Sequence, residues 1–174
     1  MPLNKYAPQV ATHRRTQNAI LEATKGLIST TGLKKMSMIE IADASEVSRA
    51  TLYNHYRDKE SVLLALCESE LERLVLLIQD TKDVADALEL LSLQVSNDPA
   101  LAAMRRNDPE FLTGVLSAHD HLLWRAFTVA LTHLLSDEKK AELVIRWLLG
   151  QALYPLSPEQ SRLQAQGIYS IANL

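Results

Sequence analysis

Apolar and polar residues between positions 37 and 59 alternate in a way that predicts two short helices joined by a tight turn. Ser37 and Glu40 form a capping box, so the first helix is expected to begin directly after Ser37. Ser48 is a good N-cap, and it predicts a second helix that reaches about Tyr56. The segment is therefore expected to form a crossed pair of helices.

The two sides of the second helix differ in chemistry. At 100° per residue, Leu52 and Tyr56 project to one side, whereas Ala50 and Asn54 project to the other. Reading a DNA major groove requires this division, because an apolar back fixes the helix while small polar residues approach the base edges. A helical hairpin inside any all-α protein would show the same spacing, so both interpretations stay open at this point.

The rest of the chain also predicts helices. Only five glycines and six prolines occur in 174 residues, which is poor material for strands and turns, so the expected fold class is all-α. An arm of residues 1–11 is expected to precede the first helix, and Gly32 is expected to end it. Caps and breakers place the remaining helices near residues 12–31, 58–79, 82–95, 99–106, 109–135, 137–153 and 158–172.

The formal net charge is −3, but its sign changes along the chain. Residues 1–60 carry nine Lys and Arg against six Asp and Glu, whereas residues 61–174 carry nine against fifteen. A basic first part on an acidic remainder suits a protein that approaches a polyanion with one end.

The sequence lacks the motifs that several classes of function require. The sequence has no glycine-rich phosphate loop, no HExxH pair and no nucleophile elbow, and its single cysteine excludes an intrachain disulfide. We therefore expect no catalytic residues, no metal site and no cofactor. Because the amino terminus lacks the apolar core of a signal peptide and no stretch is long enough to span a bilayer, we expect a cytoplasmic protein without membrane association.

Residues from about 14 to 66 resemble the DNA-binding domain of the TetR (tetracycline repressor) family of bacterial transcriptional regulators. The resemblance is carried by Gly32, Ser37, Ile41-Ala42, Val47-Ser48, Thr51-Leu52-Tyr53, His55-Tyr56 and Lys59-Glu60. It implies internal packing for Leu52 and Tyr56, and DNA contacts for Ser48, Arg49, Tyr53, His55 and Lys59. Together with the groove-facing positions, the predicted DNA-binding set is Ser37, Met38, Ser48, Arg49, Ala50, Thr51, Tyr53, Asn54, His55 and Lys59.

One residue departs from the family pattern. Glu46 stands in the turn where such regulators usually have a glycine. A left-handed backbone at this position costs a non-glycine residue about 1 kcal/mol, and the carboxylate would also lie near DNA phosphates. We therefore expect Glu46→Gly to stabilise the domain.

The sequence predicts two domains, a DNA-binding helix-turn-helix domain of residues 1–60 and a helical effector-binding and dimerisation domain of residues 61–174. Between residues 142 and 155 almost no polar side remains, so this helix must be covered on both sides. The second cover is either a second copy of the chain or the helix's own neighbours, and the resemblance implies a dimer through the last two long helices. The predicted dimer interface is Leu143, Val144, Trp147, Leu148, Leu163, Ile168 and Ile171.

A ligand pocket in the second domain is expected mainly from the resemblance. In the helix predicted at 109–135, His119 and His133 recur on one face with Leu112, so both histidines are expected to face inwards. They are either satisfied core histidines or polar anchors for a small-molecule effector, and the aromatic residues nearby are either core or pocket lining. The candidate ligand-binding residues are Met104, Phe111, His119, Trp124, Phe127 and His133.

These observations predict a TetR-like, ligand-responsive repressor that binds a palindromic DNA operator as a homodimer. The competing interpretation is an all-α adaptor that dimerises through its C-terminal helices and does not bind DNA.

Overall fold

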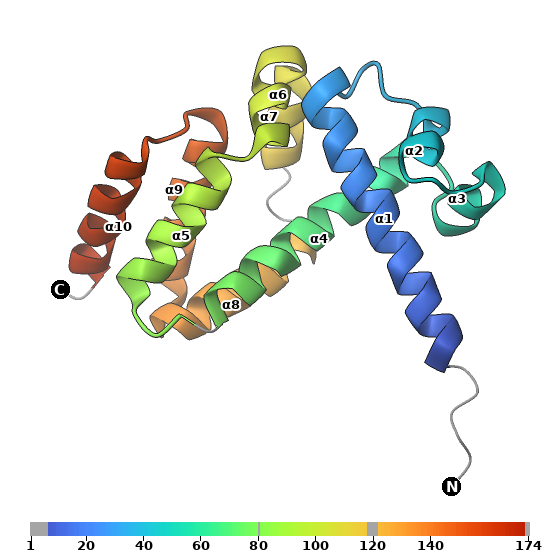
Figure 1. Cartoon of the computed structure of the whole chain (residues 1–174). Helices are drawn as coiled ribbons and strands as arrows, with labels where there is room; N and C mark the ends of the chain where they lie inside the picture. The colour runs from blue at the N-terminus through green and yellow to red at the C-terminus, as the bar shows by residue number, and fades with distance from the viewer. Residues whose placement is uncertain (1–6, 80, 118–121, 173–174) are drawn as a thin grey trace, which may run out of the picture. The chain divides into compact units, whose positions relative to one another are not determined.

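The computed structural model describes residues 7–79, 81–117 and 122–172, and within these ranges it contains ten α-helices and no strand (Figure 1). The predicted all-α class is therefore confirmed. The chain divides into two compact units, of which the first ends at Cys67 and the second begins at Glu68. This division falls inside α4 (Lys59–Gln79), whereas the sequence analysis placed a boundary after residue 60.

The first unit is built on α1 (Ala7–Thr31), α2 (Met38–Ala44), α3 (Arg49–His55) and the first turns of α4. In Figure 1, α2 lies against both α1 and α3. The expected start of α1 was wrong, because the helix already includes residues 7–11, which were assigned to an arm. Pro8 is tolerated there, since a first-turn residue needs no intrahelical N–H bond.

A single apolar core joins the helices of the first unit. It comprises the buried side chains Ile20, Leu21, Ile28, Leu33, Met36, Ile41, Ala42, Leu52, Tyr56, Val62, Leu63 and Leu66. Gly32 ends α1 with a φ of 83°, a left-handed conformation that glycine adopts without steric cost, as the sequence predicted.

The second unit contains the end of α4 and six further helices. They are α5 (Val84–Ser96), α6 (Pro99–Asn107), α7 (Pro109–Ser117), α8 (Leu122–Leu135), α9 (Glu138–Leu153) and α10 (Pro158–Ala172). The helix predicted at 109–135 corresponds to α7 and α8, and residues 118–121 between them lie outside the described ranges. Figure 1 shows α5 packed against both α9 and α10, and α8 packs against α9.

The core of the second unit is assembled mainly from α4, α5, α8 and α9. Its largest fully buried side chains include Leu88, Leu91, Phe127, Leu131 and Val144. A polar contact crosses this interior: Gln151 Oε1 on α9 accepts hydrogen bonds from Ser92 Oγ at 2.6 Å and Ser96 Oγ at 3.0 Å on α5. Because a buried polar group must be paired, this contact permits few alternative registers of α9 on α5.

Candidate nucleic-acid interface

The first helix of the predicted helix-turn-helix begins at a complete capping box. The Glu40 N–H donates to Ser37 Oγ at 3.3 Å, and the Ser37 N–H donates to Glu40 Oε2 at 2.8 Å. Both donors would otherwise be unpaired at the helix start. Ser37 itself is exposed and Met38 is half-buried, so both predicted contact residues lie at the surface of the first unit.

The turn between α2 and α3 is closed by backbone hydrogen bonds around Glu46. The Glu46 N–H donates to the Asp43 carbonyl at 3.2 Å, and the Val47 N–H donates to the Ala42 carbonyl at 3.1 Å. This pair of bonds is a Schellman motif, which requires a left-handed residue at its turn. Glu46 adopts φ 55°, so the strained backbone that the sequence predicted at this residue is confirmed.

The predicted recognition helix is α3, and its two sides divide as expected. Ser48 caps the helix by accepting the Thr51 N–H at 3.0 Å, and its Oγ also lies 2.8 Å from the Thr51 hydroxyl. Leu52 is fully buried and Tyr56 is almost so, which anchors the helix on the core. The residues that remain exposed are Ser48, Arg49, Ala50, Tyr53 and Asn54, with Thr51 and His55 half-buried at the flanks.

Exposed hydrogen-bonding groups therefore gather on one face of a helix whose other face is fixed. Tyr53 is 54% exposed and its phenol is available as a donor or acceptor. Arg49 carries five donors in the first turn, and Asn54 offers both a donor and an acceptor. This is the chemistry that base edges and phosphate oxygens require.

Lys59 has internal partners that the sequence analysis did not anticipate. Its Nζ donates to the Leu33 carbonyl at 3.4 Å and to the Met36 carbonyl at 3.3 Å, both in the connection between α1 and α2. An ammonium has three donors, so one remains for a phosphate oxygen. Lys59 therefore makes a structural contact, and its DNA contact stays a prediction.

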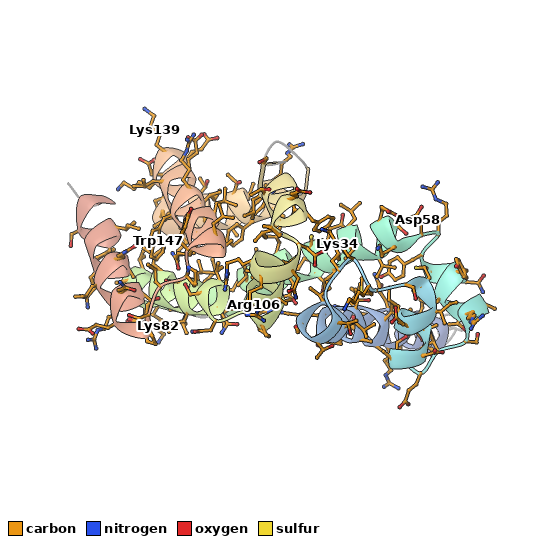
Figure 2. The ribbon with its side chains drawn as sticks, turned by 90° about the horizontal axis from the view of Figure 1, so that it is seen from above. Lys34, Asp58, Lys82, Arg106, Lys139 and Trp147 are labelled. Carbon is orange, nitrogen blue, oxygen red and sulfur yellow. The ribbon has the colours of Figure 1, made fainter. Side chains whose placement is uncertain are left out.

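The start of α4 is capped by Asp58, as predicted. Asp58 Oδ1 accepts the Ser61 N–H at 2.9 Å, and Oδ2 accepts from the Arg57 guanidinium at 2.8 Å (Figure 2). The hydrogen bond from Arg57, and then those from Ser61, hold the pKa of Asp58 below its ordinary value. The carboxylate is therefore ionised at neutral pH and neutralises Arg57 beside the exposed face of α3.

His55 is not isolated, because His13 of α1 stacks on it. The two ring centroids are 4.1 Å apart and the rings are inclined by 18°. Partial burial, and then the charge of His13, lower the pKa of His55 below its ordinary value. The sequence alone could not reveal this stack, since nothing local links positions 13 and 55.

The candidate ligand-binding residues differ in their burial. Phe127 is buried and Trp124 is half-buried, and their rings meet edge to face at 6.5 Å. Met104 is half-buried and Phe111 is exposed, while His119 lies outside the described residues. The aromatic pair on α8 is thus core packing with one partly accessible ring.

The prediction that His133 faces inwards was wrong, because its side chain is exposed. Phe127 and Leu131 set the inward face of α8, and His133 follows Leu131 by two positions, or about 200° around the helix. The heptad pattern that suggested otherwise ran from α7 across residues 118–121, so its register did not transfer to α8.

The candidate dimer residues divide between core and surface. Val144 and Leu148 are buried inside the unit, so in this conformation they offer no area to a second copy. Leu143 and Leu163 are 44% and 57% exposed, whereas Ile168 packs partly against the core. Ile171 lies in α10, but its side chain is outside the described part of the chain.

Trp147 connects the last two helices. Its indole Nε1 donates to Gln164 Oε1 at 2.8 Å, which joins α9 to α10 (Figure 2). Leu153, Tyr154 and Tyr169 are also exposed on these helices or at their ends, and the sequence analysis did not select them. Both α9 and α10 therefore carry exposed apolar side chains.

Two further tests concern metals and membranes. Among the described residues, no three His, Cys, Asp or Glu side chains are grouped so that they could hold a metal ion. None of the helices within the described ranges combines the length and apolar character needed to cross a bilayer.

Known proteins resemble this chain both in sequence and in structure. The family model described as bacterial regulatory proteins, tetR family, matches residues 20–66, which include α2, α3 and the start of α4. Two relatives from strains of Mycobacterium tuberculosis, each an uncharacterised HTH-type transcriptional regulator, are 29% identical to it. Each match covers 82% of this chain and 78% of the relative.

The fold is shared with several solved regulators. The TetR family repressor AlkX from Dietzia, implicated in biodegradation of n-alkanes, has a TM-score of 0.68 at 18% identity, covering 90% of this chain and 95% of its own. The fatty acid degradation regulator FadR from Bacillus halodurans has a TM-score of 0.63 at 17% identity, covering 90% and 94%. The dihydroxyacetone kinase operon activator DhaS has a TM-score of 0.60 at 17% identity, covering 90% and 93%.

Proposed function

We propose that this chain, whose residues 20–66 match the tetR family model, binds a palindromic operator as a homodimer and represses transcription until a small-molecule effector releases it. The observation that carries the DNA-binding part is the exposed polar face of α3, held in place by buried Leu52 and Tyr56. A structural hairpin would have no need to keep this face free of the core.

We assign two roles within the interface. Arg49 and Asn54 read base edges, because their donors and acceptors match purine edges in the major groove. Tyr53 and Lys59 contact phosphates and set the register of the helix, since a phenol and an ammonium recognise charge without reading sequence.

Substitution of these residues separates the two roles. Arg49→Ala and Asn54→Ala are expected to relax selectivity at particular base pairs, each by about 1 to 3 kcal/mol. Tyr53→Phe is expected to weaken binding to a similar extent for all sequences, and Lys59→Ala to reduce the salt slope by about one. Uniform loss from every substitution would show that these roles were assigned wrongly.

The experiment selects bound fragments from a random duplex pool and then measures mobility shifts across a salt series. Lys82→Ala, which removes an exposed lysine of the second unit (Figure 2), is the matched control for lost charge. Lys59→Ala also removes hydrogen bonds to the Leu33 and Met36 carbonyls, so thermal melting of this variant measures how much stability is lost with them. An adaptor would show no salt-sensitive, sequence-selective duplex binding, and that result would favour the competing interpretation.

The homodimer is supported by the exposed apolar side chains on α9 and α10. Leu143 and Leu163 would be buried between copies, and a C2 dimer would present two α3 helices to two half-sites. Gly150 and Gly167 on the same helices have open space around the position of an added Cβ. Glycine in a helix interior costs about 1 kcal/mol relative to alanine, and close packing of a second copy gives these glycines a role.

An effector site is proposed for the second unit on family grounds, with Trp124 as the residue best placed to report on it. Trp124 is half-buried and contacts the buried ring of Phe127. Binding of a small molecule within this unit is expected to change indole fluorescence and to weaken the duplex complex. A compound screen that reads both signals tests this, and a compound that binds without weakening the complex would be no effector.

A further inference from the structure

The stacked rings of His13 and His55 bring together residues that are far apart in sequence. His13 lies upstream of residues 20–66, the segment that the family model matches, yet its ring centroid is 4.1 Å from that of His55. We propose that the two imidazoles form one phosphate contact that takes up a proton when DNA binds, so that duplex binding tightens as the pH falls. This inference rests on the proposed function, because it requires α3 to face DNA.

In the free protein His55 favours its neutral form. Partial burial and the proximity of His13 both lower the pKa of His55. Two imidazolium rings stacked at 4.1 Å would repel each other, so a charge on His13 disfavours a charge on His55. The free protein therefore disfavours a charged His55 beside the exposed face of α3.

No neighbouring carboxylate within the described residues stabilises a positive charge on His55. The neighbouring elements carry further charged and titratable groups: Arg14, Arg15, Glu22 and Lys25 on α1, Glu40 and Asp43 on α2, Glu46 in the turn, Arg49, Tyr53 and Tyr56 on and after α3, and Arg57, Asp58, Lys59 and Glu60 at the start of α4. Glu40 is held in the Ser37 cap, and Asp58 is paired with Arg57. Within the described residues, burial and His13 shift the pKa of His55, and none of these carboxylates does.

A DNA phosphate supplies the missing negative charge. A neutral imidazole offers one N–H donor and one lone pair, and the lone pair repels a phosphate oxygen. An imidazolium offers two donors and a positive charge, which make the stronger charge-assisted hydrogen bonds. A phosphate beside the pair therefore raises its affinity for a proton, and binding and protonation favour each other.

The sign of the effect follows from this linkage. In the proposed complex the pKa of His55 is higher than in the free protein, so duplex affinity rises as the pH falls through the pKa of His55 in the complex. The gain in affinity ends below the pKa of His55 in the free protein, because His55 is then protonated before DNA binds. His13 thus acts twice, as a phosphate contact and as the group that keeps His55 neutral until DNA arrives.

The first test needs no DNA. Ring-proton NMR follows the titration of His55 in the wild-type chain and in His13→Gln, with circular dichroism to establish that both remain helical. The midpoint of His55 is expected to move up towards about 6.5 when His13 is removed. An unchanged midpoint would show that the two rings are not coupled, and the proposal would fail.

The second test measures duplex affinity between about pH 8 and about pH 6 at constant ionic strength, a range centred near the ordinary pKa of histidine. The probe is a labelled duplex of about 30 base pairs, long enough for two half-sites, selected at the upper pH. Wild type is expected to tighten by up to about tenfold per pH unit for each bound α3, the limit when each copy takes up one proton. The double variant His13→Gln/His55→Gln should show a flat profile.

His133→Gln is the matched control, because it removes an exposed histidine of the second unit and should keep the wild-type profile. A double variant that retains the wild-type slope would overturn the proposal, as would a wild type that binds with a flat profile. A wild type that binds no duplex at any pH would refute the proposed function as well, while the NMR titration would still report on the coupling of the rings.

Discussion

Replacement of Glu46 by glycine is expected to stabilise the first unit. Glu46 holds φ 55° at the turn of the Schellman motif that links α2 to α3, and its side chain is exposed. The left-handed conformation costs a residue with a Cβ about 1 to 2 kcal/mol, and glycine removes this cost. Glycine also gives the unfolded chain more freedom, which opposes the gain by about 0.4 to 1 kcal/mol.

The net expectation is a stabilisation of about 0.5 to 1 kcal/mol, or roughly 1 to 4 °C in Tm for a chain of this size. Chemical and thermal unfolding followed by circular dichroism measure it. Glu46→Ala is the control, because it also removes the carboxylate but keeps the Cβ, so it should not gain this stability. The difference in stability between the two variants therefore measures the cost of the left-handed backbone at residue 46.

Duplex binding by the same variants tests whether the Glu46 carboxylate weakens binding to DNA phosphates. Both Glu46→Gly and Glu46→Ala remove a carboxylate from the turn, so both are expected to bind phosphate more tightly and to similar degrees. Ser136→Gly, at the other non-glycine residue with positive φ among those described, should be stabilised without any change in binding. A glycine variant no more stable than the alanine variant would refute the strain argument, and weaker binding would refute the placement of the turn near DNA.

Two further predictions concern the second unit. Leu143→Glu and Leu163→Glu are expected to convert a dimer at about micromolar concentration into monomers, as measured by light scattering. Val129→Glu, at an exposed apolar residue of α8, is the control and should remain dimeric. A monomeric wild type with intact DNA binding would exclude the dimer. The N–H groups of Lys140 and Lys139 lower the pKa of the N-cap Asp137, so its contribution to stability is complete above the unfolded-state value near 3.8 and is lost as the pH falls through the lower folded-state value. Asp137→Asn should therefore lose less Tm than wild type on acidification to about pH 3, and equal losses in both would contradict this.

Local signals identified most of the helices and the centre of the candidate site. The Ser37 box, the Ser48 cap and the stop at Gly32 each act within a few residues, so they can be recognised without knowledge of the fold. The period of α3 likewise assigned Leu52 and Tyr56 to the core, because a short helix on a domain surface has only one side to bury.

Packing between distant segments could not be predicted in the same way. His133 was placed on the wrong side of α8 because a periodic pattern was carried across residues 118–121, and only the burial of Phe127 and Leu131 reveals the inward face. Val144 and Leu148 belong to the same apolar helix as Leu143, and contacts with α5 and α8 decide which of them remain exposed.

The sequence by itself determined where α2 and α3 begin, which face of α3 is polar, and the left-handed backbone at Gly32 and Glu46, because these properties depend on neighbours along the chain. The tertiary structure alone decided the stack of His13 on His55, the bonds of Lys59 to the loop after α1, and the buried contact of Gln151 with α5. Each of these joins residues more than twenty positions apart, and their meeting depends on how whole helices pack.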